Sequence, residues 1–228
     1  LIATRLAAID DVVDEGLRNG RMPGCVVLVG YRGRIGWLKS YGSRQLQPDV
    51  VPMTTDTLFD LASLTKPIAT ATSIMLLIED GLVELDAPAV KYLPEFVGHG
   101  KEAITIRQLL THQSGLLPDN SIGDYEDGRV EAFRRIHELD LRAEPGTRFM
   151  YSDVGFIVLG EIVERVSGKS QDVFTHERIF KPLGMSETAF NPGSELKPRT
   201  APTQERNGAW MRGEVHDPRA WKLGGVAG

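Results

Sequence analysis

The sequence lacks the features that mark disulfide-stabilised, membrane-spanning and nucleic-acid-binding proteins. Its 228 residues include one cysteine, Cys25, so no disulfide can form within the chain. No apolar run approaches the length of a membrane span, since residues 74–78 are followed at once by Glu79 and Asp80. The formal net charge is -5 and long basic runs are lacking, which leaves no electrostatic footprint for nucleic acid. The sequence therefore predicts neither an internal disulfide, a membrane span nor a nucleic-acid partner.

Size and composition are those of a globular protein. Hydrophobic residues make up 41% of the chain, and its length suits one large domain or two small ones. Cys25 precedes the apolar run 26–29 and has no histidine near it in sequence, so we interpret it as a buried structural thiol rather than a nucleophile. The chain begins at Leu1, which fits a removed signal peptide but does not establish one.

The hydrophobic pattern predicts strands toward the two ends of the chain and helices in its middle. Residues 26–31 and 34–41 are expected to form a hairpin with a glycine-containing turn, and one more strand is expected at 209–215. Helices are expected at 2–17, 68–78, 105–110, 127–139, 154–166 and from 170 to about 182. This arrangement favours a mixed α/β domain of the α+β type over alternating βαβ units.

One stretch combines a nucleophile with a base. Ser63 and Lys66 lie three residues apart where a loop becomes the apolar run 68–78. Positions three apart share one face of a helix, so the ammonium group can lie beside the hydroxyl. A lysine can take the serine proton when burial or nearby cations lower its pKa, and a helix N-terminus favours developing negative charge. Taken alone, the spacing also fits a helix cap followed by a solvated lysine.

A second S-x-x-K match, from Ser194 to Lys197, lacks this context. Pro192, Gly193 and Pro198 surround it, and no apolar run follows. Because the motif is short, the match alone carries little weight. We interpret this second match as a surface loop.

Several local strings occur in an order that is typical of one superfamily. Ser-Leu-Thr-Lys at 63–66 is followed by Leu-Leu-Thr-His-Gln-Ser-Gly-Leu at 109–116, Tyr-Ser-Asp-Val-Gly-Phe at 151–156 and Leu-Gly-Met at 183–185. Together they resemble the serine β-lactamase and penicillin-binding-protein superfamily, in particular the group of class C β-lactamases, D-alanyl-D-alanine carboxypeptidases and related esterases. The resemblance implies a β-lactamase/transpeptidase-like fold, with an antiparallel sheet, flanking helices and a largely helical middle region.

The resemblance also implies an organisation for the chain. We expect a single domain over residues 1–228, in which 1–57 supply a helix and the hairpin of the sheet region. Residues 58–184 would form the mainly helical region with the active-site motifs, and 185–228 a loop-rich return toward the sheet. A periplasmic or extracellular location is implied by the family, with the cytoplasm left open.

Four residues acquire roles from the resemblance. It implies that Ser63 is a nucleophile that is acylated and then deacylated by water, with Lys66 as its partner base. Tyr151 matches the family's tyrosine-x-asparagine motif, which implies a phenol that shares proton transfer with Lys66. Asn120 falls where class C-like enzymes often carry an amide that touches the acylamido group of the substrate, although a loop asparagine is also a common turn residue. No cofactor is implied.

Asp153 departs from the family pattern, which usually has asparagine at this position. An ionised carboxylate only accepts hydrogen bonds, whereas an amide also donates them to a substrate carbonyl. The charge of Asp153 would also tend to keep Lys66 protonated, which shifts the base role toward Tyr151 or weakens acylation. We place Asp153 among the substrate-binding residues. A second interpretation is that it is a favourable acidic residue in the first turn of a helix.

The family's third motif, K-T-G or a variant such as H-x-G, has no match in the sequence. In the family this motif lies on a strand beside the site and brings the second oxyanion N–H. Residues 222–228 resemble the approach to that strand, so we expect an incomplete domain: a truncated chain, a cleaved chain or one part of a two-chain assembly. Losing one oxyanion donor typically costs about a hundredfold to a thousandfold in rate, so this chain alone should be feeble or inactive.

The leading hypothesis is a serine hydrolase that acts through an acyl-enzyme on acyl-D-alanyl peptides, β-lactams or small esters. Asp153 favours a peptidase or esterase over an efficient β-lactamase. The alternatives are a non-catalytic penicillin-recognising or peptidoglycan-binding module and an inactive fragment of a longer protein. A Ser-His-Asp triad from His112 or from His216 and Asp217 is disfavoured because Lys66 already fills the base position. The five histidines show no metal-ligand spacing.

Overall fold

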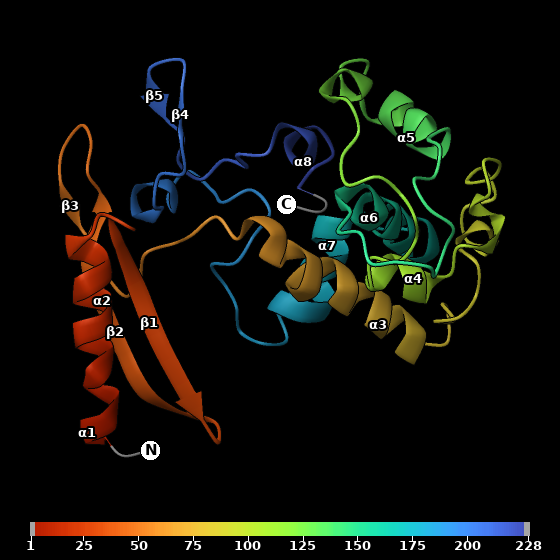
Figure 1. Ribbon diagram of the computed structural model, residues 1–228. Helices are drawn as coiled ribbons and strands as arrows, with labels where there is room; N and C mark the ends of the chain where they lie inside the picture. Colours follow the sequence, from red (N-terminus) through yellow and green to blue (C-terminus); the bar gives the residue numbers. More distant parts are fainter. Residues whose placement is uncertain (1–2, 226–228) are drawn as a thin grey trace. The chain divides into compact units, whose positions relative to one another are not determined.

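The computed structural model describes residues 3–225. Contacts divide the chain into two compact units, Leu1–Asp60 with Gly193–Glu214 and Leu61–Pro192 with Val215–Gly228 (Figure 1). The expectation of a single domain stays a prediction. None of the helices formed by the described residues has the length and hydropathy that crossing a membrane requires.

The first unit is built on an antiparallel sheet in which the hairpin prediction is confirmed. Strands β1 (Gly24–Tyr31), β2 (Arg34–Gln45) and the short β3 (Val51–Pro52) lie in the order β1-β2-β3. The β1–β2 turn has positive φ at both Arg32 and Gly33, as the two-residue hairpin turns that match strand twist require. Cys25 lies on β1 and is half-buried rather than fully buried as expected, and burial raises the pKa of its thiol.

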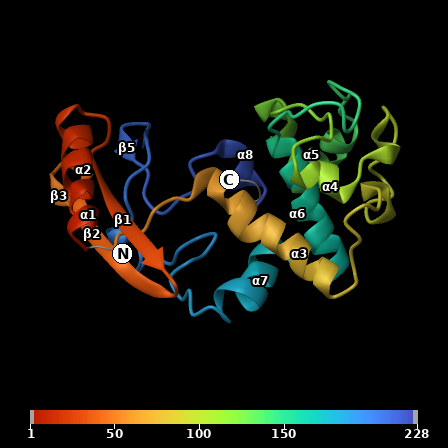
Figure 2. The same ribbon diagram turned by 60° about the horizontal axis from the view of Figure 1, so that its bottom comes forward.

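The predicted first helix is present in two pieces that cover one side of this unit. Helix α1 (Ala3–Leu6) and helix α2 (Ala8–Arg18) are separated by Ala7, whose φ of -60° and ψ of -23° remain helical, so only the hydrogen bonding is interrupted. Helix α2 packs along β2 (Figure 2). The hydroxyl of Tyr41 on β2 donates to Asp10 on α2 at 2.7 Å and thereby ties helix to sheet.

The remainder of the first unit is loop-rich. Strands β4 (Glu205–Arg206) and β5 (Ala209–Trp210) form a second, two-residue hairpin, so the strand expected at 209–215 is much shorter than predicted. The second S-x-x-K match is a surface loop, as predicted, because Ser194 is exposed and the chain makes only a single 3-10 turn, η7 (Lys197–Arg199).

The second unit is helical and is organised around α6 (Asp153–Ser167). Its residues 154–160 are all buried, as expected for a helix that is apolar on every side. It packs against α3 (Thr72–Glu79), α4 (Ile106–Leu110) and α7 (Gln171–Thr175) (Figure 2). Helix α5 (Arg129–His137) is shorter at both ends than the predicted 127–139, and α8 (Pro218–Lys222) adds one short helix that was not predicted.

Local sequence signals set several helix boundaries in this unit. The predicted capping box is present, since the Gln108 N–H donates to Thr105 Oγ1 at 3.2 Å and the Thr105 N–H donates to Gln108 Oε1 at 3.0 Å. Ser152 caps α6 by accepting the Gly155 N–H at 3.0 Å. The helix expected from 170 to about 182 begins as α7 and continues in π-helical winding as η6 (His176–Phe180).

The helix that follows Ser63 differs from the prediction of a regular helix over 68–78. A 3-10 turn, η1 (Ala62–Leu64), leads into the π-helical segment η2 (Lys66–Ala71), and regular α-helix begins only with α3. Pro67 stands near the start of η2 and lacks the N–H that regular winding would use. Short π-helical segments occur frequently at functional sites.

Candidate active site

The structure brings Ser63 and Lys66 into direct contact within the helical unit. The Lys66 Nζ donates to Ser63 Oγ at 3.1 Å. Ser63 is exposed, whereas only 2% of Lys66 is accessible. Ala62, which precedes the serine, has a φ of +45°, a conformation that non-glycine residues rarely adopt and that clusters at functional sites as well as in turns. The hydroxyl is therefore accessible from solvent while its amine partner is buried behind it.

Asp153 is the charged partner of this buried lysine. Its Oδ1 lies 2.8 Å from Lys66 Nζ, and the side chains are 3% exposed for Lys66 and 29% exposed for Asp153. A buried ammonium requires such a partner, because an isolated charge taken out of water is strongly unfavourable. Asp153 thus does more than favour the helix N-terminus, the second interpretation of this residue: its carboxylate neutralises the charge beside Ser63.

Tyr151 joins the same group through its ring. Lys66 Nζ lies 5.1 Å from the centroid of the Tyr151 ring, within the range of a cation–π contact. The side chain is 44% exposed, so the phenol is accessible to a molecule arriving from solvent. The structure therefore gathers Ser63, Lys66, Tyr151 and Asp153 from the 62–66 turn and from the segment that starts α6.

Asn120 makes its hydrogen bonds to residues outside this group. Its side-chain amide donates to Asp124 at 2.8 Å and accepts from the Tyr125 hydroxyl at 2.5 Å, while its carbonyl accepts from Arg219 Nε at 2.9 Å. The residue is buried, with 4% accessible. Burial also raises the pKa of Tyr125, which keeps its hydroxyl a donor. These bonds hold the loop that leads into η5 (Ile122–Tyr125).

Asp119 is a neighbour of the site that sequence reasoning missed. The Asp153 N–H donates to the Pro118 carbonyl at 2.9 Å, which places the chain before Asp119 against the start of α6. Burial raises the pKa of Asp119, and the charge of Asp153 adds to this increase, while Arg219 and Lys66 act in the opposite direction. The only sequence signal was its position directly before Asn120.

His112 packs against the segment that carries Tyr151. Its Nδ1 accepts the Ser152 N–H at 3.1 Å, and its ring centroid lies 4.5 Å from that of Tyr151. Asp217 accepts instead from the Arg219 and Ala220 N–H groups, each at 2.8 Å, and so caps α8. Backbone groups thus engage both the His112 Nδ1 and the Asp217 carboxylate, in keeping with the low weight given to a Ser-His-Asp triad.

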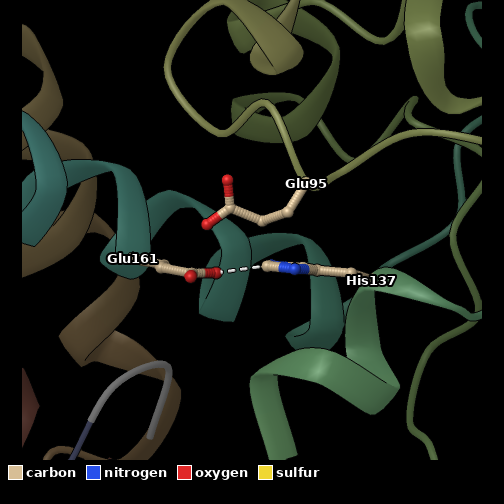
Figure 3. A group of neighbouring side chains, drawn as sticks. All are labelled: Glu95, His137 and Glu161. Atoms are coloured by element: carbon tan, nitrogen blue, oxygen red, sulfur yellow. Dashed lines mark hydrogen bonds and ion pairs between the residues drawn. The ribbon is translucent and has the colours of Figure 1, made fainter. Parts of the chain in front are cut away.

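A second group of ionisable side chains gathers around Glu161, which lies on α6 eight residues after Asp153 (Figure 3). Glu95, His137 and Glu161 offer ligand-type atoms within 4.8 Å of one another, and His137 Nε2 lies 2.7 Å from Glu161 Oε2. Arg165 pairs with Glu95 and lies 3.9 Å from Glu161 Oε1. This arginine supplies positive charge to both carboxylates, so the group is accounted for as an ion-pair network. The expectation that the protein uses no metal stays a prediction.

The fold and the pair of Ser63 and Lys66 define a mixed α/β protein with an accessible serine beside a buried lysine. Residues 9–227 match the Beta-lactamase family. The N-acetylmuramyl-L-alanine amidase of Bacillus subtilis (strain 168) is 31% identical over 98% of this chain and 58% of its own length. A putative D-alanyl-D-alanine carboxypeptidase of Escherichia coli (strain K12) is 33% identical over 87% of this chain and 52% of its own length.

Solved structures agree with these sequence relatives. EstCE1, described as a hydrolase with promiscuous acyltransferase activity, superposes with a TM-score of 0.79 at 25% identity over 99% of this chain and 69% of its own. A class C β-lactamase from Rhodobacter sphaeroides superposes with a TM-score of 0.79 at 28% identity over 95% of this chain and 60% of its own. The chain therefore belongs to the β-lactamase family and has its fold, as the ordered strings predicted. It spans about half the length of the curated relatives it matches.

Proposed function

We propose that this protein is a serine hydrolase that forms an acyl-enzyme on Ser63. The observation that carries the proposal is the 3.1 Å hydrogen bond from the buried Lys66 ammonium to the exposed Ser63 hydroxyl. A nucleophile open to solvent with a charged group behind it can attack a carbonyl while the developing charges are stabilised. The relatives named as amidase, carboxypeptidase, β-lactamase and hydrolase support this class of reaction.

The ion pair with Asp153 bears on which group takes the serine proton. Lys66 already donates to Ser63 and faces the Asp153 carboxylate at 2.8 Å, so as an ammonium it has no lone pair for another proton. We assign the base role to Tyr151, whose phenolate would be stabilised by the adjacent ammonium. The Ser63 proton then passes to the Tyr151 oxygen as Oγ bonds to the acyl carbon. Tyr151 returns it to the leaving group, and the same phenolate activates water for deacylation.

The substrate class follows from the same carboxylate. Ionised Asp153 accepts hydrogen bonds but has no N–H for a substrate carbonyl, which argues against an efficient β-lactamase. We therefore place acyl-D-alanyl peptides first, small esters as the alternative and β-lactams last. Asn120 stays a candidate for contact with the acylamido group, and this contact would require its amide to exchange the bond to Asp124. Cell-wall substrates would also place the protein in the periplasm or outside the cell.

A second candidate function is a penicillin-recognising module that acylates but does not turn over. The observation that favours it is again the ion pair, because a lysine fixed as an ammonium gives no help to deacylation. In this case Ser63 would be labelled by a penicillin and the label would persist.

A labelling experiment separates these functions. A fluorescent penicillin and a fluorophosphonate probe would be applied to wild type, to Ser63→Ala and to Ser194→Ala, the last altering the exposed serine of the second S-x-x-K match. We expect Ser63→Ala to abolish labelling and Ser194→Ala to leave it unchanged. Release of D-alanine from an acyl-D-alanyl-D-alanine tripeptide would support the hydrolase, and persistent label without release the binding module. Labelling that survives Ser63→Ala would overturn both.

A further inference from the structure

His112 makes two backbone contacts to one short segment. It follows α4 and has a φ of +57°, a strained conformation for a residue with a side chain. Its carbonyl accepts the Met150 N–H at 2.7 Å, and its Nδ1 accepts the Ser152 N–H at 3.1 Å. These two bonds bracket Tyr151, so the backbone on both sides of the phenol is held by a single residue.

The His112 ring adds packing to these bonds. Its centroid lies 4.5 Å from that of Tyr151, 5.0 Å from that of Phe156 on α6 and 5.7 Å from that of Phe149. The imidazole is thus enclosed by aromatic rings from the segment it holds and from the helix that follows. Aromatic contacts of this kind restrict the orientation of both partners.

The geometry points to His112 as a positioning residue whose neutral imidazole holds Tyr151 beside Lys66. This inference rests on the proposed function of Ser63. Because Nδ1 accepts from a backbone N–H, the neutral ring carries its proton on Nε2. A proton on Nδ1 would place two donors face to face and break the bond to Ser152. The segment 149–152 would then lose one of its two hydrogen bonds to His112.

The charges around His112 determine the pH at which the ring is protonated and the bond to Ser152 is lost. Burial lowers the pKa of the imidazole, the charge of Lys66 lowers it further, and Asp153 acts in the opposite direction. These are the charged groups that face the ring from η2 and from α6, and Tyr151 is the titratable group stacked on it. The ring is therefore neutral at pH 7. Its protonation, and with it loss of activity, is expected below the ordinary value of 6.5.

Two substitutions separate positioning from general packing. In His112→Asn the side-chain oxygen can replace Nδ1 as acceptor and does not titrate, whereas His112→Phe keeps an aromatic ring and loses the acceptor. We expect His112→Phe to lower the acylation rate of Ser63 on the order of a hundredfold, as small misplacements of reacting groups do. His112→Asn should retain most of the rate and lose the acid limb of the pH profile. His99→Asn, at an exposed histidine paired with Asp140, should change neither.

A second measurement makes the inference independent of turnover. In the Ser63→Ala variant, NMR of the imidazole nitrogens should show Nδ1 as an unprotonated acceptor at pH 7. The protection factor of the Ser152 amide, which corrects for the intrinsic pH dependence of hydrogen exchange, should fall when His112 is protonated. A Ser152 amide that is insensitive to this titration, or a His112→Phe variant with wild-type rate and pH profile, would overturn the positioning role. Failure of the hydrolase proposal would instead appear as labelling that survives Ser63→Ala.

Discussion

The carboxylate of Asp153 lies 2.8 Å from the buried ammonium of Lys66, at the position where the tyrosine-x-asparagine motif of the sequence resemblance implies an asparagine. This contact links the start of α6 to the π-helical segment η2 and sets the charge beside the candidate nucleophile. An amide in its place would be neutral and could donate a hydrogen bond. The exchange of one oxygen for one nitrogen therefore changes both the electrostatics of Lys66 and the recognition of a substrate carbonyl.

Replacement of this carboxylate should raise reactivity toward β-lactams. In Asp153→Asn, Lys66 is freed to act as a base and the amide can donate to the β-lactam side-chain carbonyl, so we expect acylation to accelerate by about tenfold or more. Stopped-flow hydrolysis of a chromogenic cephalosporin measures this rate. Asp172→Asn is the matched control, because it removes an acidic residue from the first turn of α7. An equal response in both variants, or slower acylation in Asp153→Asn, would contradict the assigned role.

The same substitution should cost stability. Removing one partner of a buried ion pair leaves the other uncompensated, a loss of about 3 to 5 kcal/mol for a fully buried pair. Asp153 is 29% exposed, so we expect a smaller loss of about 1 to 2 kcal/mol in the free energy of unfolding. Denaturant unfolding at pH 7 measures it. An unchanged midpoint would show that the pair contributes nothing to folding.

Local patterns predicted the elements that depend on local interactions. The β1–β2 hairpin follows from the apolar run 26–29 and a glycine-containing turn, and the capping box of α4 follows from side chains that bond within three residues. The Ser63 and Lys66 pair was found for the same reason, since its spacing corresponds to one helical turn. The π-helical winding of η2 was not predicted, because it depends on Pro67 together with the packing of η2 against α6.

Contacts that depend on side-chain rotamers or that join distant residues gave weaker signals. The amide of Asn120 is occupied by Tyr125 and Asp124, which depends on side-chain rotamers that spacing does not specify. The acceptor role of His112 toward Ser152 spans 40 residues, and the only hint was that both lie in strings of the family pattern. The group of Glu95, His137 and Glu161 comes from three separate elements and has no sequence spacing to reveal it.

The capping hydroxyl of Ser152 should be worth measurable stability. Its Oγ accepts the Gly155 N–H at 3.0 Å and donates to the Leu117 carbonyl at 2.7 Å, and only 1% of the residue is exposed. Loss of a serine cap typically costs about 0.5 to 2 kcal/mol, so Ser152→Ala should lose about 1 to 2 kcal/mol. Ser170→Ala is the control, because Ser170 precedes α7 without a side-chain cap bond. Urea midpoints of the two variants give the comparison, and equal losses would contradict the cap.

Lys101 should make stability depend on alkaline pH. It is fully buried and donates to the Leu139 carbonyl at 2.8 Å, and burial lowers the pKa of its ammonium from the ordinary 10.5. At a pH between the lowered pKa of Lys101 in the folded protein and its ordinary pKa in the unfolded chain, the unfolded chain binds more protons. The contribution of Lys101 to the free energy of unfolding therefore rises with pH between these two pKa values and is smallest below both.

The test of this dependence compares wild type with Lys101→Met, which has a similar shape and no titratable group. We expect the free-energy difference between the two proteins to shift in favour of wild type as pH rises from 7 to 10, because the cost of burying a charged amine disappears on deprotonation. Urea unfolding at each pH measures the difference and cancels titrations common to both.

Lys91→Met is the matched control: Lys91 is exposed and paired with Glu84, and its pKa is raised by that bond. Its difference from wild type should stay nearly constant from pH 7 to 10, since a raised folded pKa gives stability that is lost only as pH rises above the ordinary 10.5. The same direction in both variants would contradict the burial argument.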